Sequence, residues 1–238
     1  MINFFRRVRQ RLLSENKVTR YLLYALGEIL LVLGGILLAL QVNNWNVNKK
    51  EDTDLRDSLA EMIGELESDI DFLEREAGKY SAIIPKLELL IDGKYEQTDL
   101  DGFVGLFGGA CDTKNFGIIY NSLKADRKLN LIRQTQLKQM IINYYENIAE
   151  DHIYFSYWHD RFVADNIDSF ILANIPLDKE GRIDPKVAKT LLEQVKFQNI
   201  LAYQLRLYST YVDMNDRVIK DATELREALT SYIHTEAD

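Results

Sequence analysis

The chain has little of the residues that crosslink a fold, interrupt helices or bind metals. Its 238 residues include one cysteine, three prolines, three histidines and twelve glycines. The lone Cys111 excludes an intramolecular disulfide, because no second thiol exists to pair with it. Scarce proline and glycine, together with abundant Leu, Glu and Lys, favour a mostly helical body.

Motifs that carry chemistry are also missing. Gly108-Gly109 lacks the Gly-Lys-Ser/Thr ending of a phosphate loop. His152 and His159, seven residues apart, fall on nearly the same helix face, but a metal requires closer spacing or a third ligand, so we favour surface or core histidines. Three aspartates do not follow calcium-loop spacing: Asp99, Asp101 and Asp112. With no nucleophile–base grouping either, the sequence predicts a non-enzymatic protein without cofactor or metal.

Charge is divided unevenly along the chain. Residues 1–50 carry eight Lys/Arg and two acids, a net +6, and the remainder carries −14, which together give the net charge of −8. A basic start therefore precedes an acidic body. An acidic body argues against nucleic acid as a partner, because phosphates require a basic surface.

One apolar run dominates the sequence, from Tyr21 to Trp45. Between Leu22 and Leu40 its only ionisable residue is Glu28, and it contains no proline. About 20 apolar residues as a helix span about 30 Å, the thickness of the hydrocarbon core. Tyr21 and Tyr24 at one end and Trp45 at the other are suited to anchor the helix at the two interfaces. The sequence predicts a transmembrane helix over residues 21–45.

A cleaved signal peptide is the competing interpretation of this run. Its apolar region would be shorter, and Ala39-Leu40-Gln41 lacks the second small residue of a cleavage site. The flanking charges then predict the orientation. Six bases precede the span and three closely follow it: Arg6, Arg7, Arg9, Arg11, Lys17 and Arg20 before, Lys49, Lys50 and Arg56 after. The positive-inside rule places residues 1–20 in the cytoplasm and residues 46–238 outside, in the periplasm of a bacterium with two membranes.

The segment before the span is basic and amphipathic. Its apolar residues recur at helical spacing, so an in-plane helix would place its arginines on anionic lipid head groups. These arginines are Arg6, Arg7, Arg9 and Arg11. The alternative is a basic tail that serves only as a topology signal.

Within the span, small residues share one helical face with Glu28. The stripe consists of Ala25, Glu28, Val32, Gly35 and Ala39. Small residues let helices pack closely in lipid, which predicts a homo-oligomer. The alternative is that glycine is simply common in membrane helices.

Glu28 itself has two interpretations. In the structural one, a shallow glutamate hydrogen-bonds across the helix interface or reaches Arg20. In the functional one, a ring of carboxylates conducts ions or relays protons.

The body is predicted to be an antiparallel helical bundle, which makes the fold all-α. Residues 46–90 form one long helix with a nearly heptad apolar face, which Pro85 kinks or ends. That face consists of Leu55, Leu59, Met62, Leu66, Ile70, Leu73, Ala77 and Tyr80, with an irregular step between 62 and 70. Periodicity falters over residues 91–131, the predicted loop-bearing insertion.

Two short helices, linked by residues 124–128, come next in the predicted bundle. Three further helices complete it. One covers residues 149–173, with its buried side at Phe155, Trp158, Phe162 and Ile167. A short one is capped by Asp184 with Pro185 at its first position. The last covers residues 197–234 and would pair antiparallel with the helix after the span. Its apolar face consists of Leu201, Leu205, Tyr208, Val212, Val218, Ala222, Leu225 and Leu229.

Two stretches resemble a family of small bacterial single-pass membrane proteins whose domain is of unknown function. The first is FFRRVRQRLLSENKVTRYLLYALGEILLVLGGILLALQVNNWN, with its basic-aromatic start, Gly-Glu-Ile and Asn-Asn-Trp-Asn; the second is Ser122–Ile148. Together they cover about a third of the chain. Ala125-Asp126 departs from the Ser-Gly expected in the family. The resemblance implies an inner-membrane protein of Gram-negative envelopes and supplies no activity.

Two hypotheses of function follow. The first is a non-enzymatic, self-associating, membrane-anchored scaffold or sensor-like module, whose bundle contacts a partner protein, ligand or other component of the envelope. The second is an ion channel or proton-coupled subunit, with Glu28 lining the interface of an oligomer.

Overall fold

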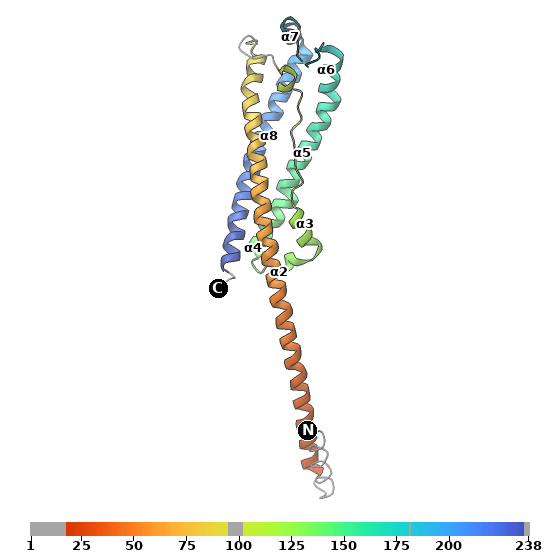
Figure 1. Ribbon diagram of the computed structural model, residues 1–238, viewed down its shortest axis with the longest axis vertical. Coiled ribbons are helices and arrows are strands. Elements are labelled where there is room, and N and C mark those ends of the chain that lie inside the picture. The colour runs from red at the N-terminus through yellow and green to blue at the C-terminus, as the bar shows by residue number, and fades with distance from the viewer. Residues whose placement is uncertain (1–17, 95–101, 181, 236–238) are drawn as a thin grey trace. The chain divides into compact units, whose positions relative to one another are not determined.

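The computed structural model describes residues 18–94, 102–180 and 182–235, with the side chains of residues 18–21 left undescribed (Figure 1). The chain divides into two compact units, Met1–Asp54 and Leu55–Asp238. The arginines predicted to contact lipid, Arg6, Arg7, Arg9 and Arg11, lie outside the described residues. The side chain of Tyr21 does too.

The described part of the first unit is helical. It belongs to α2 (Val18–Ile91), which is the one helix among the described residues that is long and apolar enough to cross a membrane. Its most apolar window has a mean hydropathy of 2.3, and none of that window is buried. The aliphatic side chains longer than alanine from Leu22 to Leu40 are exposed, from 49% at Leu33 to 77% at Leu31. Water would penalise this much apolar surface, whereas lipid would not.

The second unit is all-α in the part of the chain that the structure describes. After the remainder of α2, the elements are η2 (Phe103–Leu106), α3 (Ile118–Ala125), η3 (Lys128–Leu131), α4 (Thr135–Asn143), η4 (Tyr144–Ile148), α5 (Ala149–Phe162), η5 (Val163–Asp168), α6 (Ser169–Asn174), α7 (Pro185–Leu192) and α8 (Val195–Thr235). The elements η4 and η5 are single π-helical turns that join α4, α5 and α6 into one helical run.

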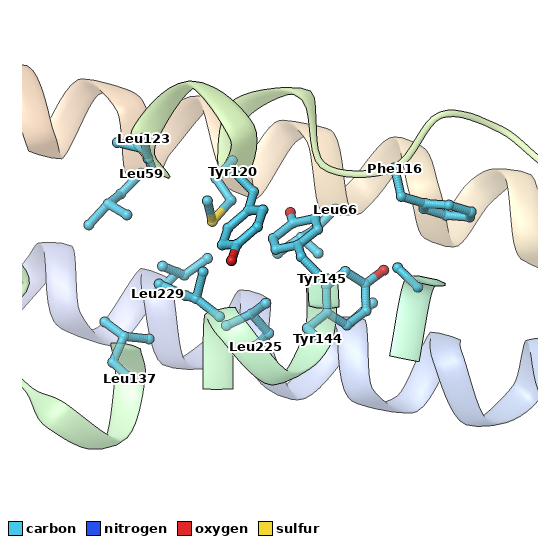
Figure 2. Packing of buried hydrophobic residues seen from close by; sticks show 14 of the residues in the cluster. Leu59, Leu66, Phe116, Tyr120, Leu123, Leu137, Tyr144, Tyr145, Leu225 and Leu229 are labelled. Atoms are coloured by element: carbon cyan, nitrogen blue, oxygen red, sulfur yellow. The ribbon is translucent and has the colours of Figure 1, made fainter. Parts of the chain in front are cut away.

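Two buried apolar clusters show that α2 and α8 pack antiparallel, as predicted. In the first cluster, α2 residues from Leu55 to Leu73 meet α8 residues from Val218 to Tyr232 (Figure 2). In the second, Tyr80 and later residues of α2 meet Phe197 to Tyr211 of α8. The run α4–α6 supplies the third side of both clusters. The prediction of an all-α antiparallel bundle is therefore confirmed.

A capping residue, a proline and a glycine account for two of the helix ends, the start of α7 and the end of α2. Asp184 caps α7 as predicted: its carboxylate accepts a 2.8 Å hydrogen bond from the Lys186 N–H, with Pro185 at the first helical position. Pro85 does not end the helix after the span, because α2 continues to Ile91. The turn after Ile91 ends the helix, where Gly93 has a φ of +73°, the left-handed conformation that glycine adopts without strain.

Candidate functional site

The predicted membrane-interface residues all lie on α2. Ala25 and Glu28 are partly exposed, whereas Val32, Gly35 and Ala39 are exposed. Of the predicted anchors, Tyr24 is 42% exposed and Trp45 63% exposed. The Lys49 ammonium lies 5.6 Å from the Trp45 ring centroid, a cation–π contact. Self-association requires a second chain and stays a prediction.

Inside the second unit, polar side chains occupy positions where a bundle normally places apolar ones. Helix α5 and the first residue of η5 bury residues at alternating steps of three and four: Ala149, His152, Ser156, His159 and Val163. Both imidazoles are fully buried, and Trp158, predicted to be buried, is 39% exposed. Of the predicted buried side, Ile167 is buried and Phe155 and Phe162 are partly buried, so the prediction was wrong for Trp158 and off by about one position around the helix over residues 155–162. The same spacing on α8 buries Gln204 and Asn215 completely.

Most of these polar groups hydrogen-bond an irregular segment that passes along the bundle from η2 to α3, beside α2, α5 and α8 (Figure 1). The crossing segment, residues 107–117, has no strand partner. Its backbone N–H groups donate only two helical-type bonds, both at its start, from Phe107 and Gly108 to the Val104 carbonyl. Phe107, Cys111 and Phe116 anchor it in the apolar clusters. Buried peptide groups must be hydrogen-bonded, so the neighbouring helices supply partners through side chains.

His159 connects the crossing segment to α8. The Cys111 N–H donates to Nδ1 of His159 at 3.1 Å, so Nδ1 is the unprotonated nitrogen. Nε2 then carries the proton and donates to Oε1 of Gln204 at 2.8 Å. The Gln204 amide in turn donates to the Phe107 carbonyl at 2.7 Å and the Gly109 carbonyl at 3.2 Å. One imidazole and one amide thus serve three peptide groups of the segment.

His152 makes the equivalent connection one heptad earlier. Its Nε2 lies 2.9 Å from Oδ1 of Asn215, and its Nδ1 lies 3.4 Å from the Thr113 hydroxyl. Asn215 also donates to the Leu73 carbonyl of α2 at 3.2 Å. Asn215 therefore joins all three long helical elements of the bundle.

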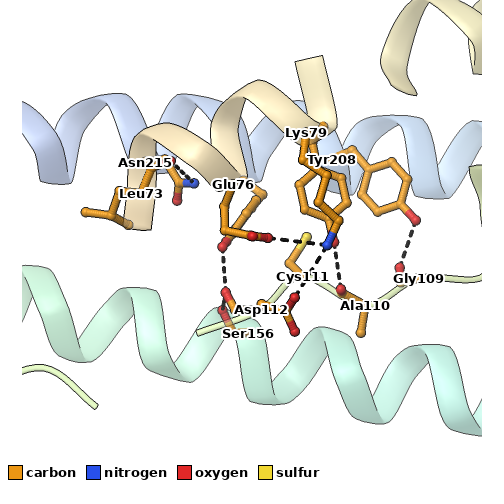
Figure 3. A network of polar contacts seen from close by, with 12 residues as sticks. Leu73, Glu76, Lys79, Gly109, Ala110, Cys111, Asp112, Ser156, Tyr208 and Asn215 are labelled. Carbon is orange, nitrogen blue, oxygen red and sulfur yellow. Dashed lines mark hydrogen bonds and ion pairs between the residues drawn. The ribbon is translucent and has the colours of Figure 1, made fainter. Parts of the chain in front are cut away.

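Tyrosine hydroxyls bind the carbonyls that remain (Figure 3). Tyr80 donates to Ala110 at 2.6 Å and Tyr208 donates to Gly109 at 2.7 Å. Tyr211 and Ser156 both donate to the Asp112 carbonyl, at 2.5 and 3.3 Å. The crossing segment is held from α2, α5 and α8 at once.

The charged side chains of the same segment form ion pairs with α2. Lys114 lies 2.6 Å from Oδ1 of the fully buried Asp69, and Lys79 lies 3.4 Å from both Glu76 and Asp112. Burial raises the pKa of Asp69 to about 6, although Lys114 acts in the opposite direction. Burial also raises the pKa of the Cys111 thiol, which leaves it an unreactive thiol.

The groups of this network attach the crossing segment to α2, α5 and α8. Burial lowers the pKa values of His152 and His159, while their bonds to Asn215 and Gln204 act in the opposite direction. Both ring nitrogens of each histidine already have partners, which leaves no free lone pair facing a cleft. Among the described residues, no three His, Cys, Asp or Glu side chains are grouped to hold a metal ion.

The sequence-based predictions missed Gln204, Tyr211 and Asn215, and included Tyr80 and Tyr208 only as members of apolar helix faces. A signal was present: on α8 the positions 201, 204, 208, 211, 215, 218, 222, 225 and 229 follow unbroken steps of three and four. The prediction chose Leu205 and Val212, which are only partly buried. On α2, Asp69 fills the irregular step between 62 and 70.

Comparisons with known proteins found no counterpart: no protein-family model matches the chain, and no curated protein or solved structure does.

The lowered pKa of His159 predicts a pH-dependent contribution to stability. The folded state favours the neutral ring, so this contribution is complete above the ordinary histidine pKa of about 6.5 and is lost as pH falls below it. We expect His159→Gln, which keeps one donor and one acceptor, to be less stable than wild type at pH 7.5. The difference in free energy of unfolding should narrow toward pH 5, measured by urea denaturation.

Asp69 provides a contrast of opposite sign. Its raised pKa means that the folded state favours the protonated acid, so its stabilising contribution is complete below about 3.8 and is lost as pH rises through about 6. The free energy of unfolding of Asp69→Asn, measured relative to wild type, should therefore rise from pH 5 to pH 7.5. Parallel stability curves for wild type and His159→Gln would contradict the histidine assignment.

Proposed function

We propose that the chain is a non-enzymatic module anchored in the bacterial inner membrane, which self-associates through its span and presents its bundle to the periplasm as a scaffold or sensor. One observation carries this proposal: the apolar part of α2 is fully uncovered, while the second unit has an apolar interior of its own. Lipid is the environment in which that helix has no exposed-surface penalty.

The interior of the bundle supports a binding role over catalysis. The side chains of His152, His159 and Gln204 contact the crossing segment, as do the hydroxyls of Tyr80, Tyr208 and Tyr211, and the buried thiol is protonated at neutral pH. Catalysis would require a reactive group with a free lone pair near a site for substrate. The resemblance of the first 46 residues to single-pass inner-membrane proteins, and the excess of bases before the span, support the location and orientation.

The experiment is the oligomeric state of the full-length protein in lipid nanodiscs. We expect a discrete oligomer for wild type, and a shift toward monomer for Gly35→Leu, because a bulky side chain on the small-residue face separates the helices. Gly27→Leu, a matched change on another face of the same helix, should leave the oligomer intact. Mass photometry or in-disc crosslinking measures the outcome.

Glu28→Gln distinguishes the scaffold from the alternative of an ion-conducting subunit. A scaffold keeps its oligomeric state and shows no proton or cation flux across liposomes, with or without the substitution. Flux in wild type that Glu28→Gln abolishes would favour the channel. A monomer that is indifferent to every substitution would contradict self-association and leave a tethered domain.

A further inference from the structure

A cleft on the second unit has no role in the network described above. It lies between η5–α6 and the first turns of α8 and has a volume of about 440 Å³. That volume is within the range of pockets that bind small molecules. One wall is the π-helical turn η5, an element that is rare and frequently found at functional sites.

The floor of the cleft is aromatic and continues outside it. Phe162 and Phe170 line the cleft, and the Tyr203 ring lies 4.9 Å from that of Phe162. Trp158, which does not line the cleft and is 39% exposed, stacks on Phe162 with ring centroids 5.8 Å apart and an interplanar angle of 19°. Tyr154, one turn earlier on α5, is 70% exposed. The exposed rings of Trp158 and Tyr154 can therefore contact the part of a ligand that extends beyond the cleft.

Neutral hydrogen-bonding groups dominate the rim. It is formed by Asn166, Ser169, Asn174, Asn199 and Tyr203. Asn166 and Asn174 each donate one amide hydrogen to the carbonyl four residues earlier, at 3.0 and 2.9 Å. These bonds hold the two amide groups and leave the amide oxygens able to accept a hydrogen bond from a ligand.

Charge contributes little to this cleft. Its charged lining residues are one acid and one base, which offset each other. Asp165 pairs with Arg161 at 3.6 Å, and the Lys196 ammonium lies 5.3 Å from the Phe170 ring centroid. A charged ligand would have to compete with these contacts. A neutral ligand would pack on Phe162 and Tyr203, because Lys196 and the stacked Phe197 already contact the Phe170 ring.

We propose that this cleft binds a ring of a neutral oligosaccharide. A sugar ring has an apolar face of C–H groups that packs on aromatic rings, and a circumference of hydroxyls that pair with amides and hydroxyls. The adjacent Trp158 and Tyr154 extend the contact to a neighbouring sugar unit. The inference rests on the proposed function, because it names the class of envelope component that the bundle contacts.

The test is a titration of the full-length protein in nanodiscs with maltotetraose, cellotetraose and chitotetraose. The chain has two tryptophans, so a Trp45→Phe background leaves Trp158, beside the cleft, as the fluorescent probe. We expect at least one tetrasaccharide to change its fluorescence saturably below about 10 mM. Diglycine, a zwitterion of similar polarity, should not.

Two variants locate the site. Phe162→Ala should weaken binding about tenfold. Asn199→Ala, at an exposed position where folding is unaffected, should weaken it about 3–10-fold, as expected for the loss of one hydrogen bond. Asn121→Ala on α3, which is outside the cleft, is the matched control and should bind as wild type.

Failure of this inference is distinguishable from failure of the proposed function. No response to any tetrasaccharide, equal binding by all variants, or binding of diglycine that Asp165→Asn abolishes would each overturn the inference. The oligomeric state of the same nanodisc samples is measured in parallel. An intact oligomer that binds no sugar leaves the anchored, self-associating module standing.

Discussion

Replacing Gln204 with leucine is expected to lower the free energy of unfolding by about 3–5 kcal/mol, although leucine has similar volume and is apolar. The substitution leaves the His159 Nε2–H and the Phe107 carbonyl buried without partners. An orphaned buried polar group costs about 1–3 kcal/mol, and here two are orphaned together. The Gly109 carbonyl keeps its bond from Tyr208.

The measurement is urea denaturation of the full-length protein in detergent, followed by Trp158 fluorescence in the Trp45→Phe background. Gln139→Leu on α4 makes the same chemical change at an exposed position and should alter stability by less than about 0.5 kcal/mol. If Gln204→Leu were as mild as this control, the crossing segment would not depend on the amide for its attachment.

A double-mutant cycle separates the amide from its histidine. Because His159 and Gln204 share one hydrogen bond and serve the same segment, their effects should not add. The double replacement Gln204→Leu with His159→Leu should cost less than the sum of the two single changes, since it removes both members of the buried bond. Additive costs would indicate that the two side chains act on the segment independently.

The helices could be predicted because their evidence is local. Apolar residues at steps of three and four, a capping aspartate before Pro185 and few helix breakers predicted that residues 21–90 are helical, and predicted α8 and the start of α7 within a few residues. The buried polar residues on α5 and α8 could not be predicted by the same method. Counting apolar residues passes over Gln204 and Asn215, whose burial depends on what a distant segment requires.

The crossing segment was predicted only as a loop-bearing insertion. It has no periodicity, and its partners lie far away in sequence, 48 residues for Cys111 with His159 and 99 for Gly109 with Tyr208. Burial of a loop depends on these long-range bonds, which no local pattern encodes. The candidate sugar cleft shares this property, because α5–α6 and α8 meet there only in the folded chain.

Replacing Gly117 with alanine is expected to cost about 3–4 kcal/mol, the sum of a backbone cost and a steric one. Gly117 begins α3 with φ +82°, a conformation that alanine adopts at a cost of about 1–2 kcal/mol. An added Cβ would also lie 2.9 Å from Cδ1 of Tyr145. That ring is confined, because it stacks on Tyr120 at 4.9 Å and meets Tyr144 edge-on at 4.8 Å.

Alanine substitutions at two other glycines serve as controls for the backbone cost and the steric cost. Gly93→Ala has a similar φ of +73° and no atom within 4 Å of its Cβ, so it should show the backbone cost alone, about 1–2 kcal/mol. Gly64→Ala, in the open middle of α2, should stabilise the protein by about 0.5–1 kcal/mol. If Gly117→Ala cost no more than Gly93→Ala in urea denaturation, Tyr145 would be free to move. The aromatic stack of Tyr120 on Tyr145 would then not fix where the crossing segment enters α3.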